Sequence, residues 1–457
     1  MIDLLLINPS LDWKLEREKK LAARLEPDVP YGEAPNIGIA YLLASAKQAG
    51  IKVRYCDMVA DGISGDSLIA LIKKERPGLI GFTAFTVQIN AAGILASEIK
   101  KVSPNQTIMV GGCHASTIPV QTLEEFPAFD FVVCGEGEET VQRVIESNNG
   151  FDSLPGVVTR QRRNKRGSVP DIDSIPFPAW DEFDLSKYPG CCPLYPNRKE
   201  LQIVTSRGCP FQCTFCCRAL GSKSRRRCVA SVISGVENNI ERYGCELIEF
   251  SDETFILDRE WSVEFFQEMI KRGLNKKIQW GCSTRVSNTS PELFARMREA
   301  GCYYIFFGLE SADNDTLKRI KKGTTVEEIK QSVEWCKMAG IIPIGAFIIG
   351  LEGDIEEHVH KDIALGRELD LFSITFPVAV PFPGTVLRSL ASKGSYGLRV
   401  TSNNWDDYGK QGVGVMESID FPLSRRQELK DFAYSQFPKQ KLSDYLERQR
   451  SKRYPFY

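Results

Sequence analysis

The stretch RGCPFQCTFC, residues 207–216, places three cysteines in a C-x3-C-x2-C spacing on a predicted loop that follows an extended run, Leu201–Thr205. Three closely spaced thiolates without a matching fourth ligand can hold three irons of an iron–sulfur cluster and leave the fourth iron open to a substrate. The spacing therefore predicts that Cys209, Cys213 and Cys216 hold a 4Fe–4S cluster.

A structural zinc site is the alternative for the same cysteines. Such a site normally completes its tetrahedron with a second C-x2-C or an H-x3-5-H pair, and none follows this loop in a chain with only three histidines. Cys217 and Cys228 are nearby thiols that could complete a zinc site, so this alternative stays open. We expect Cys217 to be a buried bystander.

Composition indicates an ordered protein and argues against several partners. The chain has 457 residues, of which 42% are hydrophobic and 26% charged, with a formal net charge of −1. This length suggests about three domains, and a charge near zero gives no strong attraction to nucleic acid or anionic membranes. No run reaches the ~18 apolar residues of a membrane span, and the N-terminus lacks the basic segment of a signal peptide. The 14 cysteines are scattered, and a cluster needs reduced thiols, so we expect a cytoplasmic protein.

In residues 1–150, extended apolar runs alternate with helical runs. Strands are predicted at Leu4–Ile7, Val53–Cys56, Leu79–Thr83, Thr107–Gly111 and Phe131–Cys134, and helices at Ile37–Gln48, Ser67–Glu75, Asn90–Val102, near Gln121 and at Glu138–Ser147. This alternation predicts an α/β domain with a doubly wound, five-stranded parallel sheet that binds ligands at the carboxyl ends of its strands.

Glycines follow two of these strand ends, in VGGCHAS (residues 110–116) and CGEGE (residues 134–138). Gly111, Gly112, Gly135 and Gly137 would let the backbone approach a bulky ligand closely. Turn glycines at strand–helix junctions are the alternative explanation.

Residues 151–199 change in character and predict an extended linker. The basic run RQRRNKRG, residues 160–167, is interpreted as a solvated hairpin turn. The proline-rich run IPFPAW, residues 175–180, favours extended chain.

Residues 200–385 contain six strand–helix repeats. Strands are predicted at Leu201–Thr205, Leu247–Ser251, Ile278–Ser283, Tyr303–Leu309, Ile341–Ile349 and Phe372–Val378, with helices at Val232–Tyr243, Glu260–Arg272, Pro291–Ala300, Val326–Ala339 and Ile355–Leu369. The repeats predict an open, six-stranded partial (β/α)6 barrel with its reactive groups at the carboxyl-terminal mouth. Residues 386–457 form a small mixed C-terminal region.

The cysteine loop, including the aromatic Phe215 before its last cysteine, resembles the signature of the radical S-adenosylmethionine (radical SAM) enzymes. The resemblance implies that SAM binds to the open iron and to groups at the strand ends. The residues it implicates are Phe215 within the signature, Asp252 and Glu253, where a carboxylate could accept hydrogen bonds from the methionyl ammonium, and Ser283 and Arg285, where the guanidinium could pair with the methionyl carboxylate. It further implicates Glu310 and Ser311, and Phe347 in the segment 345–354, which resembles the one that packs on adenine. The C-terminal region typically caps the active site in this family, and the basic run 223–227 could recognise an acidic substrate.

The N-terminal domain resembles the cobalamin-binding domain that precedes the radical module in one large class of these enzymes. The resemblance implies corrin contacts from Thr83, Phe85, Gly111, Gly112, His114, Gly135, Glu136 and Gly137. Cobalamin domains that ligate cobalt from below use an Asp-x-His-x-x-Gly loop after the first strand, where this chain has Asn8-Pro9-Ser10. We therefore expect cobalamin without a histidine on the metal.

These resemblances predict an enzyme in which a 5'-deoxyadenosyl radical abstracts hydrogen from an unactivated carbon, followed by methyl transfer from methylcobalamin. The alternative is a radical SAM cyclase or rearrangement enzyme, with a cobalamin-free N-terminal domain as one form of it. A methylthiotransferase and a non-catalytic iron–sulfur electron carrier are less favoured. Expected partners are a small-molecule, peptide or lipid substrate and an electron donor such as flavodoxin or ferredoxin.

Overall fold

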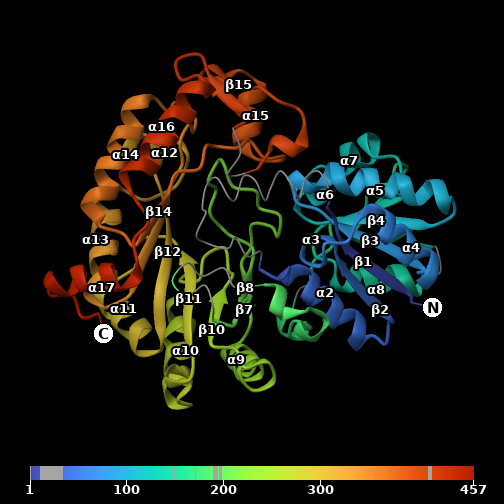
Figure 1. Ribbon diagram of the computed structural model, residues 1–457, viewed down its shortest axis with the longest axis horizontal. Coiled ribbons are helices and arrows are strands. Elements are labelled where there is room, and N and C mark those ends of the chain that lie inside the picture. Colours follow the sequence, from blue (N-terminus) through green and yellow to red (C-terminus); the bar gives the residue numbers. More distant parts are fainter. Residues whose placement is uncertain are drawn as a thin grey trace. The chain divides into compact units, whose positions relative to one another are not determined.

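The chain folds into two compact units, residues 1–198 and residues 199–457, each built on a six-stranded sheet (Figure 1). The computed structural model describes residues 2–10, 34–147, 150–169, 171–188, 194, 198–409 and 414–456. The four-part division into domains drawn from the sequence stays a prediction.

The first unit contains the predicted parallel α/β sheet. Its strands are β1 (Leu4–Asn8), β2 (Val53–Asp57), β3 (Leu79–Thr83), β4 (Thr107–Gly111), β5 (Phe131–Val133) and β6 (Val157–Val158), in the order β2-β1-β3-β4-β5-β6. The first five strands pair in parallel, and β6 pairs antiparallel with β5. The structure therefore confirms the fold class and adds one short antiparallel strand to the five that were predicted.

Helices cover both faces of this sheet (Figure 1). α2 (Ile37–Gln48) packs against α8 (Glu138–Glu146), and α4 (Gly65–Glu75) packs against α5 (Ile89–Val102). Shorter elements are α3 (Met58–Asp61), η1 (Thr86–Gln88), α6 (Cys113–Thr117) and α7 (Pro119–Glu125). Because both faces are covered, a strand can be apolar on both of its sides, as β1 is from Leu4 to Ile7 before it ends at the buried Asn8.

The segment predicted as a linker packs onto the first unit. It contains η2 (Phe151–Ser153), β6, η3 (Ile172–Ser174), η4 (Trp180–Glu182) and η5 (Leu185–Lys187). The Trp180 side chain is fully buried, and the backbone N–H of Thr159 donates to the Arg162 carbonyl at 2.8 Å, which closes a turn within the basic run. Residues 189–193 and 195–197 of the predicted linker lie outside the described residues.

The second unit contains the predicted partial barrel. Its strands are β7 (Glu200–Ile203), β10 (Leu247–Phe250), β11 (Gln279–Thr284), β12 (Cys302–Glu310), β13 (Ile342–Phe347) and β14 (Ser373–Thr375), each paired in parallel with its predecessor in this series. The outer helices are α9 (Val229–Tyr243), α10 (Arg259–Lys271), α11 (Pro291–Glu299), α13 (Val326–Met338) and α14 (Glu356–Leu369), with η6 (Leu274–Lys276) after α10. A small hairpin, β8 (Ser206–Arg207) with β9 (Arg225–Arg226), encloses the cysteine loop. One further helix, α12 (Asn314–Arg319), follows β12 and was not predicted.

Aromatic side chains fill the space between the barrel strands and α10. Phe250 stacks on Phe255 with ring centroids 4.9 Å apart, and it meets Phe265 of α10 and Trp280 of β11 edge-on at 5.4 Å each. All four residues are fully buried. Burying side chains of this size supplies much of the stability that holds this part of the barrel together.

The C-terminal region contains α15 (Val386–Ser392), η7 (Ser395–Gly397), β15 (Leu398–Val400), η8 (Trp405–Asp407), β16 (Met416–Ser418), α16 (Leu423–Gln436) and α17 (Leu442–Ser451). α16 packs on α14, and Tyr445 of α17 meets Phe372 edge-on at 5.4 Å. α15 contacts the cysteine loop, since the Leu387 N–H donates to the Thr214 carbonyl at 2.9 Å. Among the helices that the structure describes, none is long and apolar enough to cross a membrane.

Candidate active site

The three predicted cluster cysteines lie in one short loop between β8 and β9. Gly208, just before Cys209, has a φ of 88°, and a Cβ atom there would stand 2.4 Å from the Lys223 carbonyl oxygen. Glycine is therefore required where the loop begins. Cys209 is half-buried, Cys213 is buried and Cys216 is exposed. Cys217 is exposed as well, so the expectation that it is buried is wrong.

The surroundings of Cys213 favour its thiolate form. Its pKa is lowered to about 6, chiefly by a hydrogen bond from Cys216 and further by the positive charges of Lys322 and Arg285, against the opposing effect of burial. The same hydrogen bond raises the pKa of Cys216. Because thiolates, not thiols, bind metals, this setting suits a cluster ligand.

No three His, Cys, Asp or Glu side chains in the described part of the chain surround a single metal position. A 4Fe–4S cluster does not need such a group, because each of its cysteines binds a different iron.

Arg285, just after β11, lies against the cysteine loop. Its guanidinium stands 3.9 Å from the centroid of the Phe211 ring, and its Nη1 donates to the Cys213 sulfur at 3.4 Å. The side chain is buried, yet its Nη2 has no hydrogen-bond partner among the described residues. A buried guanidinium nitrogen without an acceptor is costly, so this atom suits a ligand carboxylate such as that of SAM. Ser283, two residues earlier, is half-buried.

Asp252 and Glu253 follow β10 and have different surroundings. The Asp252 carboxylate is buried and accepts hydrogen bonds from the Thr205 N–H at 2.7 Å, the Thr205 hydroxyl at 2.5 Å and the Ser206 hydroxyl at 2.6 Å. Burial raises its pKa, and nearby Arg226 opposes that rise. Glu253 is exposed and contacts the backbone of Gly208, immediately before Cys209. Of the two carboxylates, Glu253 is therefore the one open to a ligand.

The end of β12 supplies a buried ion pair. Glu310 accepts a hydrogen bond from the Lys322 ammonium at 2.6 Å, and both side chains are over nine-tenths buried. The neighbouring Ser311 hydroxyl donates to Asp362 at 3.4 Å and accepts from the Asp313 N–H at 3.2 Å, so it belongs to a separate network described below.

The end of β13 differs from its expected role in one respect. Phe347 is fully buried and its ring stacks on Phe376, with centroids 5.8 Å apart, so its side chain serves the core. Farther along, Glu352 is 1% exposed, and neither oxygen of its carboxylate has a hydrogen-bond partner in the described structure. Sequence reasoning placed Glu352 only within a segment expected near adenine, and its burial could not be read from the pattern.

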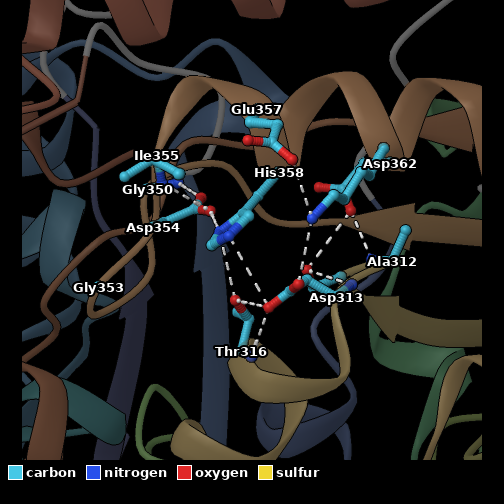
Figure 2. Close-up of polar contacts among 12 residues, drawn as sticks. Ala312, Asp313, Thr316, Gly350, Gly353, Asp354, Ile355, Glu357, His358 and Asp362 are labelled. Carbon is cyan, nitrogen blue, oxygen red and sulfur yellow. Dashed lines mark hydrogen bonds and ion pairs between the residues drawn. The ribbon is translucent and has the colours of Figure 1, made fainter.

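Figure 2 shows a polar network that joins α12 to the loop after β13. His358 of α14 lies between Asp354, whose Oδ1 is 2.8 Å from Nδ1, and Thr316, whose hydroxyl is 3.4 Å from the same nitrogen. Asp354 also accepts the Gly350 N–H at 2.7 Å, and Asp313 accepts the Thr316 N–H at 2.9 Å. This network fixes both strand-end segments, and sequence analysis missed it.

The basic run after the cysteine loop is partly structural. Arg226 lies 4.3 Å from the Trp261 ring centroid and donates to the Phe255 carbonyl at 2.8 Å. It also lines an open pocket of about 550 Å³ with Ser224, Leu257, Asp258, Arg259 and Glu260. Acidic and basic side chains alternate there, so the pocket has no clear preference for an acidic substrate.

In the first unit, the chain's own packing accounts for three of the four strand-end glycines. A Cβ atom would stand 2.6 Å from the Ala84 carbonyl at Gly112, 2.3 Å from the Gly167 carbonyl at Gly135 and 2.9 Å from Leu42 at Gly137. At Gly111 the nearest atom would be 3.7 Å away, in ordinary contact. The alternative explanation, turn glycines, therefore covers most of this motif.

The other predicted corrin contacts also differ in exposure. His114 is 1% exposed, and Glu136 is buried and accepts the Val169 N–H at 2.5 Å. Thr83 is half-buried, whereas Phe85, in the loop after β3, is 58% exposed. Phe85 is thus the large apolar side chain that this loop presents at the carboxyl edge of the sheet.

Beside it lies a hydrogen-bonded network that sequence analysis did not identify. Gln88 accepts the Phe85 N–H at 3.1 Å and donates to Asn8 at 2.9 Å, and Asn8 donates to Asp57 at 3.0 Å. Asp57 also accepts the hydroxyls of Tyr55 at 2.8 Å and Tyr188 at 2.6 Å. Polar residues at the ends of β1 and β2 were the available signal. The network holds the carboxyl edge of three strands in place.

Comparisons with known families cover most of the chain. The B12 binding domain family matches residues 28–145, and the Radical SAM superfamily matches residues 203–366. An uncharacterized methyltransferase of Pyrococcus horikoshii is 31% identical over 384 residues, which cover 82% of this chain and 81% of that protein. The anaerobic magnesium-protoporphyrin IX monomethyl ester cyclase of Cereibacter sphaeroides is 28% identical, covering 78% of this chain and 60% of the cyclase.

The fold has solved counterparts. The structure of the radical SAM methyltransferase TsrM from Kitasatospora setae, with cobalamin and a [4Fe-4S] cluster bound, aligns with a TM-score of 0.71 at 17% identity over 98% of this chain and 90% of TsrM. The B12 binding domain match covers the first sheet, and the Radical SAM match covers the cysteine loop and most of the second sheet. The Pyrococcus relative is similar over most of the chain. We conclude that the chain belongs to the cobalamin-dependent class of the radical SAM superfamily.

Proposed function

We propose that the protein is a cobalamin-dependent radical SAM methyltransferase that methylates an unactivated carbon. The observation that carries the proposal is the buried Arg285 Nη2, which has no acceptor among the residues that the structure describes and belongs to a side chain that contacts Cys213 of the cysteine loop. A site for a thiolate-bound cluster and a site for a carboxylate thus lie together, as SAM requires when it binds the open iron.

The chain's own groups bind and orient SAM in this proposal. Cys209, Cys213 and Cys216 hold the cluster, and Phe215 lines its loop. Arg285 pairs with the methionyl carboxylate, and Glu253, exposed next to Gly208, accepts hydrogen bonds from the methionyl ammonium. Glu310 and the backbone at the ends of β12 and β13 position the remainder of SAM.

When bound, the cluster supplies the electron that splits SAM to a 5'-deoxyadenosyl radical, and the corrinoid supplies a methyl group to the carbon radical left by hydrogen abstraction. The protein contributes positioning and exclusion of water. An electron donor such as flavodoxin or ferredoxin and a reducing cytoplasm belong to the same proposal.

The corrin is proposed to bind at the carboxyl edge of the first sheet. Gly111 and Thr83 would offer backbone to the corrin there, and the exposed Phe85 ring would pack against it. An apolar ring cannot ligate a metal, and His114 is buried. Neither Phe85 nor His114 would therefore serve as a metal ligand, and the corrinoid would supply the methyl group.

Cyclisation is the second candidate, because the Cereibacter relative carries that activity in its name. The experiment that separates the two uses SAM with a trideuterated methyl group. The protein is reconstituted anaerobically with iron, sulfide and hydroxocobalamin, then incubated with the labelled SAM and a strong chemical reductant that supplies the two electrons needed to convert the Co(III) to Co(I). The corrinoid is then analysed by mass spectrometry, with a protein-free sample that contains the same reductant as control. Methyl transfer predicts label on the corrinoid only with protein. A protein that retains no corrinoid and transfers no label contradicts methyl transfer and favours the cyclase.

A further inference from the structure

Lys322 is a buried cation that neither the family resemblance nor the proposed SAM contacts include. It lies three residues after α12, and its ammonium is 2.6 Å from Glu310 Oε1. The Lys322 side chain is 6% exposed and that of Glu310 is 9% exposed. Lysine is almost never this buried without a partner, and a buried pair costs both charges their hydration. Because burying this pair costs free energy, we expect the pair to perform a function at this position.

The backbone on both sides of the pair adopts costly conformations that bring the two charges together. Glu310 has a φ of 67° and Lys321 a φ of 54°, in the left-handed region that non-glycine residues avoid. The pairing of β12 with β13 shifts register between Gly308 and Glu310, as a β-bulge does. At Gly308, a Cβ atom would stand 2.4 Å from Glu310 Oε1 and 2.9 Å from Lys322 Nζ, so any other residue there would displace the two charged groups from their present positions.

The Lys322 segment is also bonded to the cysteine loop. The Thr214 N–H donates to the Ile320 carbonyl at 3.1 Å, and the Cys213 sulfur lies 3.8 Å from the Lys321 carbonyl oxygen. At the last residue of α12, Arg319 donates to the Glu352 carbonyl at 3.2 Å. The backbone from residue 320 to residue 322 is thus held directly against the loop that carries Cys213.

A buried positive charge at this place acts on the cluster and on Glu310. When a cluster takes up an electron it becomes more negative, and a nearby cation stabilises that state more strongly where water is scarce. Glu310 offsets part of this effect. The ammonium also fixes the direction of the Glu310 carboxylate, because one of its oxygens is held at 2.6 Å.

We propose that Lys322 is a positioning residue that aims Glu310 at SAM and raises the reduction potential of the cluster. The inference rests on the proposed function, since it requires a 4Fe–4S cluster on the cysteine loop. Lys322 thereby links the strand end that binds SAM to the loop that holds the iron.

The test compares variants of the full chain, reconstituted anaerobically, by two readouts other than turnover. One is the midpoint potential of the cluster from a redox titration followed by electron paramagnetic resonance, and the other is SAM affinity by equilibrium dialysis. We expect Lys322→Met to shift the potential to a more negative value and to weaken SAM binding at least tenfold. Lys322→Arg keeps the positive charge, so the midpoint potential of its cluster should stay close to the wild-type value.

Two further variants complete the design. Glu310→Gln should shift the midpoint potential of the cluster to a more positive value, because the anion that offsets the charge of Lys322 is gone. The same variant should weaken SAM binding, because the carboxylate proposed to contact SAM is lost. Lys318→Met is the matched control, since Lys318 is an exposed lysine of α12, and it should leave both readouts at their wild-type values.

The inference is overturned if Lys322→Met, with its cluster loaded, matches Lys318→Met in both readouts. A potential of Glu310→Gln at or below the wild-type value also overturns it, and this second arm holds even if Lys322→Met fails to retain iron. Wild-type protein that binds neither cluster nor SAM would contradict the proposed function instead, so the two failures are distinguishable.

Discussion

Neighbouring side chains at one strand end perform different tasks. Asp252 and Glu253 have similar chemistry and adjacent positions, and the sequence alone gave no means of choosing between them. The structure shows Asp252 buried, with three hydrogen bonds to Thr205 and Ser206. Those bonds fix the strand end from which the cysteine loop departs. Glu253 is exposed beside that loop.

The matched substitutions Asp252→Asn and Glu253→Gln should therefore separate stability from binding. In Asp252→Asn an amide N–H₂ replaces an acceptor of buried donors, and we expect the free energy of unfolding to fall by about 2 kcal/mol. Glu253→Gln should change it by less than ~0.5 kcal/mol, yet weaken SAM binding about tenfold. Urea unfolding and equilibrium dialysis measure the two quantities. The assignment is wrong if Asp252→Asn is as stable as the wild type while only its SAM binding is lost.

At the scale of elements, long apolar strands and periodic helices were predictable from the sequence. Short elements and hydrogen-bonded networks were not. β3, β4 and α2 have the bounds predicted for them, because their runs are apolar or amphipathic over five residues or more. α12 has six residues and β6 has two, too few to show a period.

Networks were the other feature that the sequence did not reveal. In the network of Figure 2, His358 meets Thr316, 42 residues away, and Ser311 meets Asp362, 51 residues away. A hydrogen bond over such a separation depends on the final fold and leaves no mark on local pattern. The three cysteines, by contrast, lie within eight consecutive residues, so their spacing was visible at once.

A pair of acidic side chains inside the barrel sheet gives a prediction at this scale. Glu249 of β10 receives a hydrogen bond from the Tyr304 hydroxyl of β12 at 2.8 Å. Glycine at Gly281 admits that ring, since a Cβ atom would stand 2.1 Å from it. Burial and then the charge of Glu200 raise the pKa of Glu249 to about 7, from an ordinary 4.5.

Because the native pKa is the higher one, the folded protein binds more protons than the unfolded chain between about pH 4.5 and about pH 7. The stability contributed by protonated Glu249 is complete below that window and is lost as the pH rises through it. Glu249→Gln keeps a neutral group against Tyr304 at every pH. As the pH rises, the free energy of unfolding of the variant should therefore increase relative to that of the wild type, by at most about 3 kcal/mol.

Urea unfolding at about pH 5 and about pH 8 measures this gain, with Glu241→Gln on exposed α9 surface as the control that should show none. An equal difference between Glu249→Gln and wild type at both pH values would contradict the account.

At the scale of the whole molecule, two parallel sheets each bring polar groups to the carboxyl ends of their strands. In the first unit these are Asn8, Asp57 and the loop carrying Phe85, and in the second they are the cysteine loop, Arg285 and Glu310. The order of the two units along the chain agrees with the matches to the B12 binding and Radical SAM families. Substrate recognition depends on side chains outside these shared elements, which is why the fold and cofactor class were predictable and the substrate was not.

The central claim is that the cysteine loop carries a cluster that reduces SAM. The most direct measurement is the formation of 5'-deoxyadenosine from SAM by the anaerobically reconstituted protein under a strong reductant, quantified by mass spectrometry. We expect the wild type to form it and Cys217→Ala, an exposed thiol next to Cys216, to do the same. The triple variant Cys209→Ala, Cys213→Ala and Cys216→Ala should lose both iron and product. Product from the triple variant at the wild-type rate, or none from a wild type loaded with four irons, would contradict the account.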